Sequence, residues 1–129
     1  MIKRNICIID DDPTNVLITK ALLNLIDSQG FILTYNDGKE AYDGLIELCM
    51  NNETIPEVYF LDINMPIWDG WDFLDEIAKL NSQKQVSIFV LSSSNNPEDA
   101  ARALTYQNVK SYIVKPVTLD VLKKEFDQI

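Results

Sequence analysis

Five short apolar runs, each rich in β-branched or aromatic residues, recur along the chain and are typical of buried strands. They occupy residues 6–9, 31–35, 58–61, 86–91 and 111–114. The stretches between them place apolar residues at helical spacing, as at Ile18, Leu22, Leu25 and Ile26. Strand and helix therefore alternate five times, and runs apolar enough to be covered on both faces predict a parallel sheet between two layers of helices.

Short polar side chains stand where the predicted helices begin. These positions are Asp12, Asp37, Asp69, Asn96 and Thr118. Such a side chain accepts a hydrogen bond from a free backbone N–H of the first helical turn. Proline follows two of them, and proline loses nothing at the first helical position. The third acid of the triplet at residues 10–12 is therefore predicted to cap a helix.

The length and composition suit one domain, residues 1–129, of the doubly wound α/β class. Apolar residues make up 47% of the chain and charged residues 24%, an ordinary balance for a globular protein. No window approaches the roughly 20 apolar residues of a membrane span. The first residues lack the apolar region and cleavage site of a secretory signal. We therefore expect a soluble protein of the cytoplasm that does not bind membranes.

Charge and residue usage exclude several kinds of chemistry. The net charge of −9 disfavours direct binding of nucleic acid and favours a cation or a basic partner surface. The chain has no histidine, which is the commonest general base and transition-metal ligand. The two cysteines lack the close spacing of a metal site. Any chemistry must therefore use carboxylates, hydroxyls and lysine.

Polar side chains follow four of the predicted strands. Asp10 and Asp11 follow the first, Asp62 the third, Ser92 the fourth and Lys115 the fifth. In doubly wound sheets, ligands bind beyond the carboxyl ends of the strands. Three carboxylates gathered there repel one another and either take up protons or bind a cation, and Mg²⁺ prefers such oxygen ligands. The sequence therefore predicts a magnesium site.

The same edge of the sheet is expected to carry groups that hold a phosphoryl oxygen. Ser92 supplies a hydroxyl and Lys115 a cation, and one carboxylate remains to act as a nucleophile. Asp62, at the end of a rigid central strand, is the candidate for an aspartyl phosphate. Each signal alone also fits a cap, a polar loop or a turn, but four of them at the ends of four strands favour a site.

Four motifs extend this pattern to a known family. The chain contains the segments "IIDDDP", "FLDINMPIWDG", "VLSSS" and "YIVKP", in the same order and at the same spacing as the motifs of that family. Together they resemble the receiver domain of two-component response regulators, the group that includes the single-domain chemotaxis regulator. The resemblance implies a flavodoxin-like, five-stranded parallel sheet of order 2-1-3-4-5 with five helices.

The resemblance also implies a role for each site residue. Asp62 would be the phosphoacceptor. Asp11 would bind Mg²⁺ directly, Asp10 mainly through water, and the backbone carbonyl of Asn64 would be a further ligand. Lys115 would pair with the phosphoryl group, and its peptide bond to the following proline is typically cis in the family.

Two further residues would form the switch of the family. Ser92 matches its hydroxyl and Tyr112 its aromatic residue, and their movement would reshape the surface of the fourth helix, fifth strand and fifth helix. Serine replaces the threonine of the best-known members, and one extra residue separates Ser92 from Lys115. Asn64 and Ser94 flank the site and are expected to tune the rate of dephosphorylation.

The implied function is signalling. The chain would accept phosphate from a sensor histidine kinase or a histidine phosphotransfer protein. It would catalyse only its own phosphotransfer and dephosphorylation, and it would have the option of a homodimer through the switching surface. A pseudo-receiver that only mediates protein contacts is the main alternative. A haloacid dehalogenase phosphatase needs a second acid where Asn64 stands. A flavodoxin-like carrier would have its flavin phosphate repelled by the three acids after the first strand.

Overall fold

The computed structural model describes residues 4–26, 29–80 and 86–129. Its strands are β1 (Arg4–Ile9), β2 (Gln29–Tyr35), β3 (Val58–Asp62), β4 (Ser87–Ser92) and β5 (Val109–Val114). Its helices are α1 (Pro13–Asn24), α2 (Gly38–Met50), α3 (Gly70–Ala78), α4 (Pro97–Leu104) and α5 (Leu119–Asp127). The predicted alternation of strand and helix is therefore confirmed.

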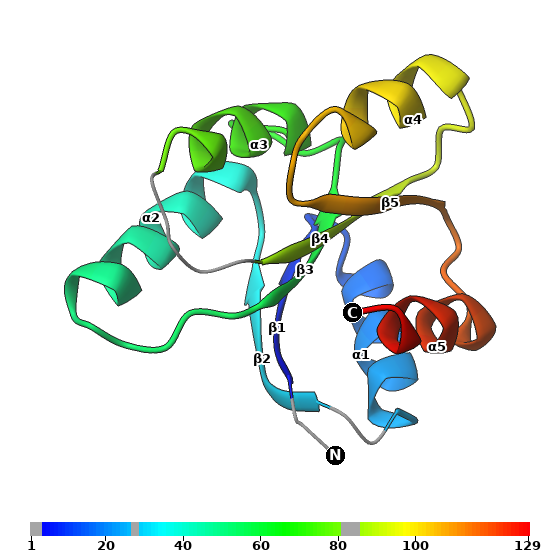
Figure 1. Cartoon of the computed structure of the whole chain (residues 1–129), viewed down its shortest axis with the longest axis horizontal. Coiled ribbons are helices and arrows are strands. Elements are labelled where there is room, and N and C mark those ends of the chain that lie inside the picture. Colours follow the sequence, from blue (N-terminus) through cyan, green and yellow to red (C-terminus); the bar gives the residue numbers. More distant parts are fainter. Residues whose placement is uncertain (1–3, 27–28, 81–85) are drawn as a thin grey trace.

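The strands form one parallel sheet in the order β2-β1-β3-β4-β5, counted over the described part of the chain. Figure 1 shows α1 and α5 on one face of this sheet and α2, α3 and α4 on the other. β1 and β3 are neighbours, so the winding reverses between them. The flavodoxin-like order that the resemblance implied is confirmed.

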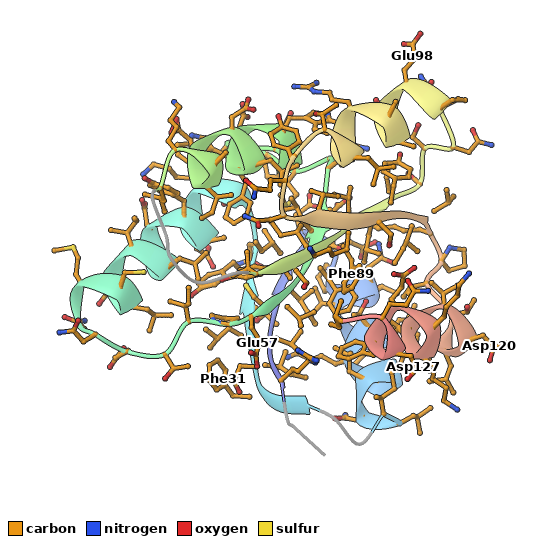
Figure 2. The ribbon with its side chains drawn as sticks, viewed as in Figure 1. Phe31, Glu57, Phe89, Glu98, Asp120 and Asp127 are labelled. Atoms are coloured by element: carbon orange, nitrogen blue, oxygen red, sulfur yellow. The ribbon has the colours of Figure 1, made fainter. Side chains whose placement is uncertain are left out.

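Two apolar clusters hold the helices against the sheet. Successive side chains of a strand point to opposite faces, so Cys7 of β1 joins the cluster under α2, α3 and α4, and Ile8 joins the one under α1 and α5. Phe89 of β4 lies in the second cluster, beside α5 (Figure 2). All five residues of β3 are buried. The central strands are thus covered on both faces, as their continuous apolar sequence predicts.

All five predicted helix caps are present. The capping residues are Asp12, Asp37, Asp69, Asn96 and Thr118. The side chain of Asp12 accepts a hydrogen bond from the backbone N–H of Thr14 at 3.0 Å. Asp69 and Asp72 form a reciprocal capping box at the start of α3. The start of each helix was therefore predictable from its capping residue.

Other local expectations were less accurate. Three strands, β1, β2 and β5, begin two residues earlier than their apolar runs. Of the four apolar residues that indicated the first helix, Leu22 and Ile26 pack against the core, whereas Ile18 is 40% and Leu25 is 66% exposed. Among the described residues, no helix combines the length and the apolar character that a bilayer crossing requires.

Gly70, the first residue of α3, packs directly against the end of β3. Its backbone N–H donates to the carbonyl of Ile63 at 2.8 Å. A Cβ atom at this position would lie 2.7 Å from the backbone oxygen of Asp62 and 2.8 Å from Cα of Ile63. Backbone atoms in a packed strand end cannot move aside cheaply. Glycine here allows α3 to start immediately beside Asp62.

We predict that Gly70→Ala lowers the free energy of unfolding by about 1–3 kcal/mol, the usual cost of overpacking. Gly44→Ala in α2 is the matched control, because its Cβ would meet the side chain of Tyr35 rather than backbone. Alanine also favours a helix interior by about 1 kcal/mol over glycine, which offsets that contact. Urea unfolding of both variants checks this. An equal or smaller loss in Gly70→Ala would contradict the role of this glycine.

Candidate functional site

Three carboxylates meet at the carboxyl edge of the sheet. Asp10 and Asp11 directly follow β1, and Asp62 is the last residue of β3. Each offers one oxygen, and these oxygens all lie within 4.8 Å of one another. Asp10 is 3% and Asp62 5% exposed, whereas Asp11 is open to solvent. The structure thus brings together the three acids that the strand ends singled out.

Lys115, which follows β5, points into this group of acids. Its Nζ lies 3.3 Å from Oδ2 of Asp10 and 3.3 Å from Oδ1 of Asp62. Its backbone N–H donates to the carbonyl of Ser92 at 2.8 Å, and its peptide bond to Pro116 is cis, as the resemblance implied. The lysine therefore bridges the acids of two neighbouring strands.

The charges in this group are not balanced. The pKa of Asp62 is raised to about 6: burial is the largest cause and the charge of Asp10 adds to it, whereas Lys115 and the N–H of Asn64 act in the opposite direction. A charged carboxylate in a poorly solvated site next to another acid is costly. The ionised form of Asp62 therefore has a cost that a bound cation would relieve.

Backbone groups orient the acids. The carboxylate of Asp10 accepts a hydrogen bond from the N–H of Asp12 at 2.9 Å. Oδ1 of Asp62 accepts from the N–H of Asn64 at 3.4 Å. Asp12 itself turns away to cap α1, where it also accepts from the side chain of Asn15 at 3.1 Å. Only two acids of the triplet therefore face the site, as the capping prediction required.

Ser92, the last residue of β4, is buried at the same carboxyl edge of the sheet. β4 pairs with β3 so that Asp62 lies opposite Leu91, and Ser92 itself pairs with Val114 of β5. The Oγ of Ser92 accepts a hydrogen bond from the N–H of Ser94 at 3.0 Å. Ser92 thus lies on the strand between β3, which carries Asp62, and β5, which leads to Lys115.

Tyr112 is connected to Ser92 through one residue. Its hydroxyl donates to the carbonyl of Ser94 at 2.7 Å. The side chain of Ser94 donates to Asp99 in the first turn of α4 at 3.1 Å. Sequence reasoning missed Asp99, because a hydrogen bond between a loop and a helix leaves no periodic signal. The acid five positions after Ser94 is the one hint the sequence contains.

The donor set fits Mg²⁺. Carboxylate oxygens are hard ligands, and Mg²⁺ is commonly held by one or two carboxylates together with water. The three acids present oxygen atoms alone, without the nitrogen or sulfur ligands that favour zinc. The exposed position of Asp11 leaves room for water molecules beside it. The backbone carbonyl of Asn64 remains a predicted ligand.

Comparison with known proteins places this site in a family. The model of the response regulator receiver domain matches residues 6–127. Chemotaxis protein CheY-3 of Vibrio cholerae is 33% identical over 124 residues, which cover 96% of this chain and 89% of that protein. The sensor protein EvgS of Escherichia coli is 32% identical over 127 residues, 98% of this chain but 10% of EvgS.

A solved structure supports the same assignment. The two-component response regulator from Cytophaga hutchinsonii superposes with a TM-score of 0.88 at 26% identity, covering 98% of this chain and 96% of that one. The fold, the strand-end acids and the match of the family model over most of the chain agree. The chain belongs to the family of response regulator receiver domains.

Proposed function

We propose that residues 1–129 act as a receiver that accepts a phosphoryl group on Asp62 in a Mg²⁺-dependent reaction and then changes the surface formed by α4, β5 and α5. One observation carries this proposal. Nζ of Lys115 lies 3.3 Å from Oδ1 of Asp62 and from Oδ2 of Asp10, within a group of three acids suited to a divalent cation. Receiver domains interact with histidine kinases, which fits a phosphohistidine donor.

The proposed transfer needs a nucleophile and groups that hold the phosphoryl oxygens. An Asp62 carboxylate oxygen attacks phosphorus, a P–O bond forms, and the P–N bond to the donor imidazole breaks with its electron pair on nitrogen. A pKa of about 6 leaves Asp62 ionised at pH 7.5, ready to attack. Lys115 then holds one phosphoryl oxygen by charge and Ser92 holds another by a hydrogen bond.

The acids divide the binding of the metal. Asp11 is open to solvent and free to bind Mg²⁺ directly, together with Asp62 and the carbonyl of Asn64. The carboxylate of Asp10 already accepts from the N–H of Asp12 and from Lys115, which favours contact through water. Bound Mg²⁺ would supply positive charge against the oxygens of the transferred group.

The donor must be a separate protein or domain if it is a phosphohistidine, because this chain has no histidine. A sensor histidine kinase or a histidine phosphotransfer protein provides that group. Leu104 of α4 and Val114 of β5 are exposed, which would permit a homodimer through the switching surface. A pseudo-receiver with the same fold would bind partners without taking up phosphate.

Phosphoryl labelling tests the proposed acceptor directly. Native protein incubated with acetyl phosphate and Mg²⁺ should gain the mass of one phosphoryl group, and Asp62→Asn should gain none because the nucleophile is gone. Chelation of Mg²⁺ should prevent the gain. Intact-mass spectrometry measures each outcome.

Asp12→Asn is the matched control for labelling, since it removes a neighbouring acid that caps α1 instead of facing the site. It should be labelled like the native chain. Labelling of Asp62→Asn would disprove the acceptor assignment. A native chain that stays unlabelled by acetyl phosphate and by a kinase, with its fold confirmed, would indicate a pseudo-receiver.

The raised pKa of Asp62 also predicts how a substitution at this position changes stability. A raised acid pKa means that the folded state holds the charged form less favourably than the unfolded state, so the charge lowers stability at pH 7.5. Without Mg²⁺, Asp62→Asn should therefore raise the free energy of unfolding by about 0.5–2 kcal/mol, the usual gain from relieving strain at a functional site. Chemical denaturation at pH 7.5 with a chelator tests this.

Asp12→Asn controls for the change in net charge, because asparagine caps a helix about as well as aspartate. Its stability should stay close to that of the native chain. A loss of stability in metal-free Asp62→Asn would mean that Lys115 more than balances the buried acids.

A further inference from the structure

Four hydrogen bonds meet at Ser94, in the loop between β4 and α4. Its N–H donates to Oγ of Ser92 at 3.0 Å, and its carbonyl accepts from the hydroxyl of Tyr112 at 2.7 Å. Its own Oγ donates to Oδ2 of Asp99 at 3.1 Å and accepts from the N–H of Asn96 at 3.2 Å. One residue therefore connects a strand-end hydroxyl, an aromatic residue of β5 and the first turn of α4.

The helix at the end of this connection is held by few apolar contacts. Ala103 is the one buried residue of α4, all of which the structure describes. The guanidinium of Arg102 lies over the ring of Trp71 of α3, 4.1 Å from its centroid. Polar contacts thus hold α4 at its first turn through Asp99 and near its end through Arg102. A helix with so little buried surface changes position at low cost.

The hydroxyl of Ser92 can accept one hydrogen bond and donate another at the same time. It accepts from the N–H of Ser94 and still has its own proton to donate to a phosphoryl oxygen. Hydrogen bonds joined in such a chain polarise one another, so a new acceptor at Ser92 alters its bond with Ser94. Any displacement of Ser94 moves its carbonyl and its Oγ together. Tyr112 and Asp99 would then both respond.

We propose that Ser94 and Asp99 are positioning residues for the switch that the family resemblance implies: their side-chain hydrogen bond holds the loop from which the Ser94 carbonyl accepts from Tyr112. The inference rests on the proposed phosphorylation of Asp62 and adds two residues, Ser94 and Asp99, on which the response of Tyr112 would depend. The charged Asp99 makes the stronger kind of hydrogen bond with the Ser94 hydroxyl and so fixes the loop that presents the carbonyl to Tyr112. If the role of Ser94 were purely local, its hydroxyl would serve only to accept the hydrogen bond from the N–H of Asn96 in the turn before α4.

The experiment follows Tyr112 directly in the full chain. The protein contains five tyrosines, and incorporation of 3-fluorotyrosine gives each a ¹⁹F resonance. Tyr112→Phe removes one resonance and so assigns it. Spectra are recorded without metal, and again with Mg²⁺ and acetyl phosphate, while intact mass gives the labelled fraction. The measured quantity is the displacement of the Tyr112 resonance on labelling.

Ser94→Ala and Asp99→Ala should each reduce that displacement to less than half of the native value while Asp62 is still labelled. Ser94→Thr retains a hydroxyl and Asp99→Asn retains a side-chain oxygen acceptor, so both should restore it. Ser93→Ala and Glu98→Ala are the matched controls and should behave like the native chain. Ser93 is exposed, and Glu98 points outward from the start of α4 (Figure 2).

A native-sized displacement in labelled Ser94→Ala would overturn the coupling. A native chain that is never labelled would instead contradict the proposed function, and the metal-free spectra would then decide the positioning role. In that case, a Tyr112 resonance displaced by Ser94→Ala and restored by Ser94→Thr supports the role. An identical resonance in native and Ser94→Ala protein overturns it.

Discussion

The structure depends on a repulsion that the fold does not allow to relax. Asp10 directly follows β1 and Asp62 ends the neighbouring β3, and the register pairs Ile9 with Leu61, so the two buried carboxylates cannot move apart without breaking the sheet. Lys115 bridges them, yet the pKa of Asp62 remains raised. The fold thereby holds an incompletely balanced acid at the place where the proposed cation and phosphoryl group would bind.

The surroundings of the acids maintain this arrangement from several sides. Gly70 lets α3 begin against the end of β3, and the N–H of Asp12 fixes the carboxylate of Asp10. The N–H of Lys115 binds the carbonyl of Ser92, which sets the lysine relative to β4. Each contact involves backbone atoms of the sheet or its adjoining loops. The positions of the charged groups therefore follow from the fold and change little with side-chain motion.

Much of this could be read from the sequence where local rules apply. The caps and the strand-end acids follow from residue chemistry and from the parallel sheet, and the family resemblance supplied the strand order. The buried side of α1 followed only in part from periodicity, because Leu22 packs against the core whereas the apolar residues Leu17 and Ile18 are exposed. The Ser94–Asp99 contact depends on how the loop meets α4, which no sequence pattern specifies.

The site and the helix that would respond to it differ in how they are held. β3, which carries Asp62, is buried along its whole length, whereas α4 buries Ala103 alone among its residues, all within the described chain. A structural change at the acids would therefore displace the buried sheet at high cost and the weakly packed α4 at low cost. Because the cost of displacement is lower at α4, a rearrangement that begins at Ser92 would be absorbed there. With the proposed function, the domain would keep the geometry of its acids constant while one surface changes.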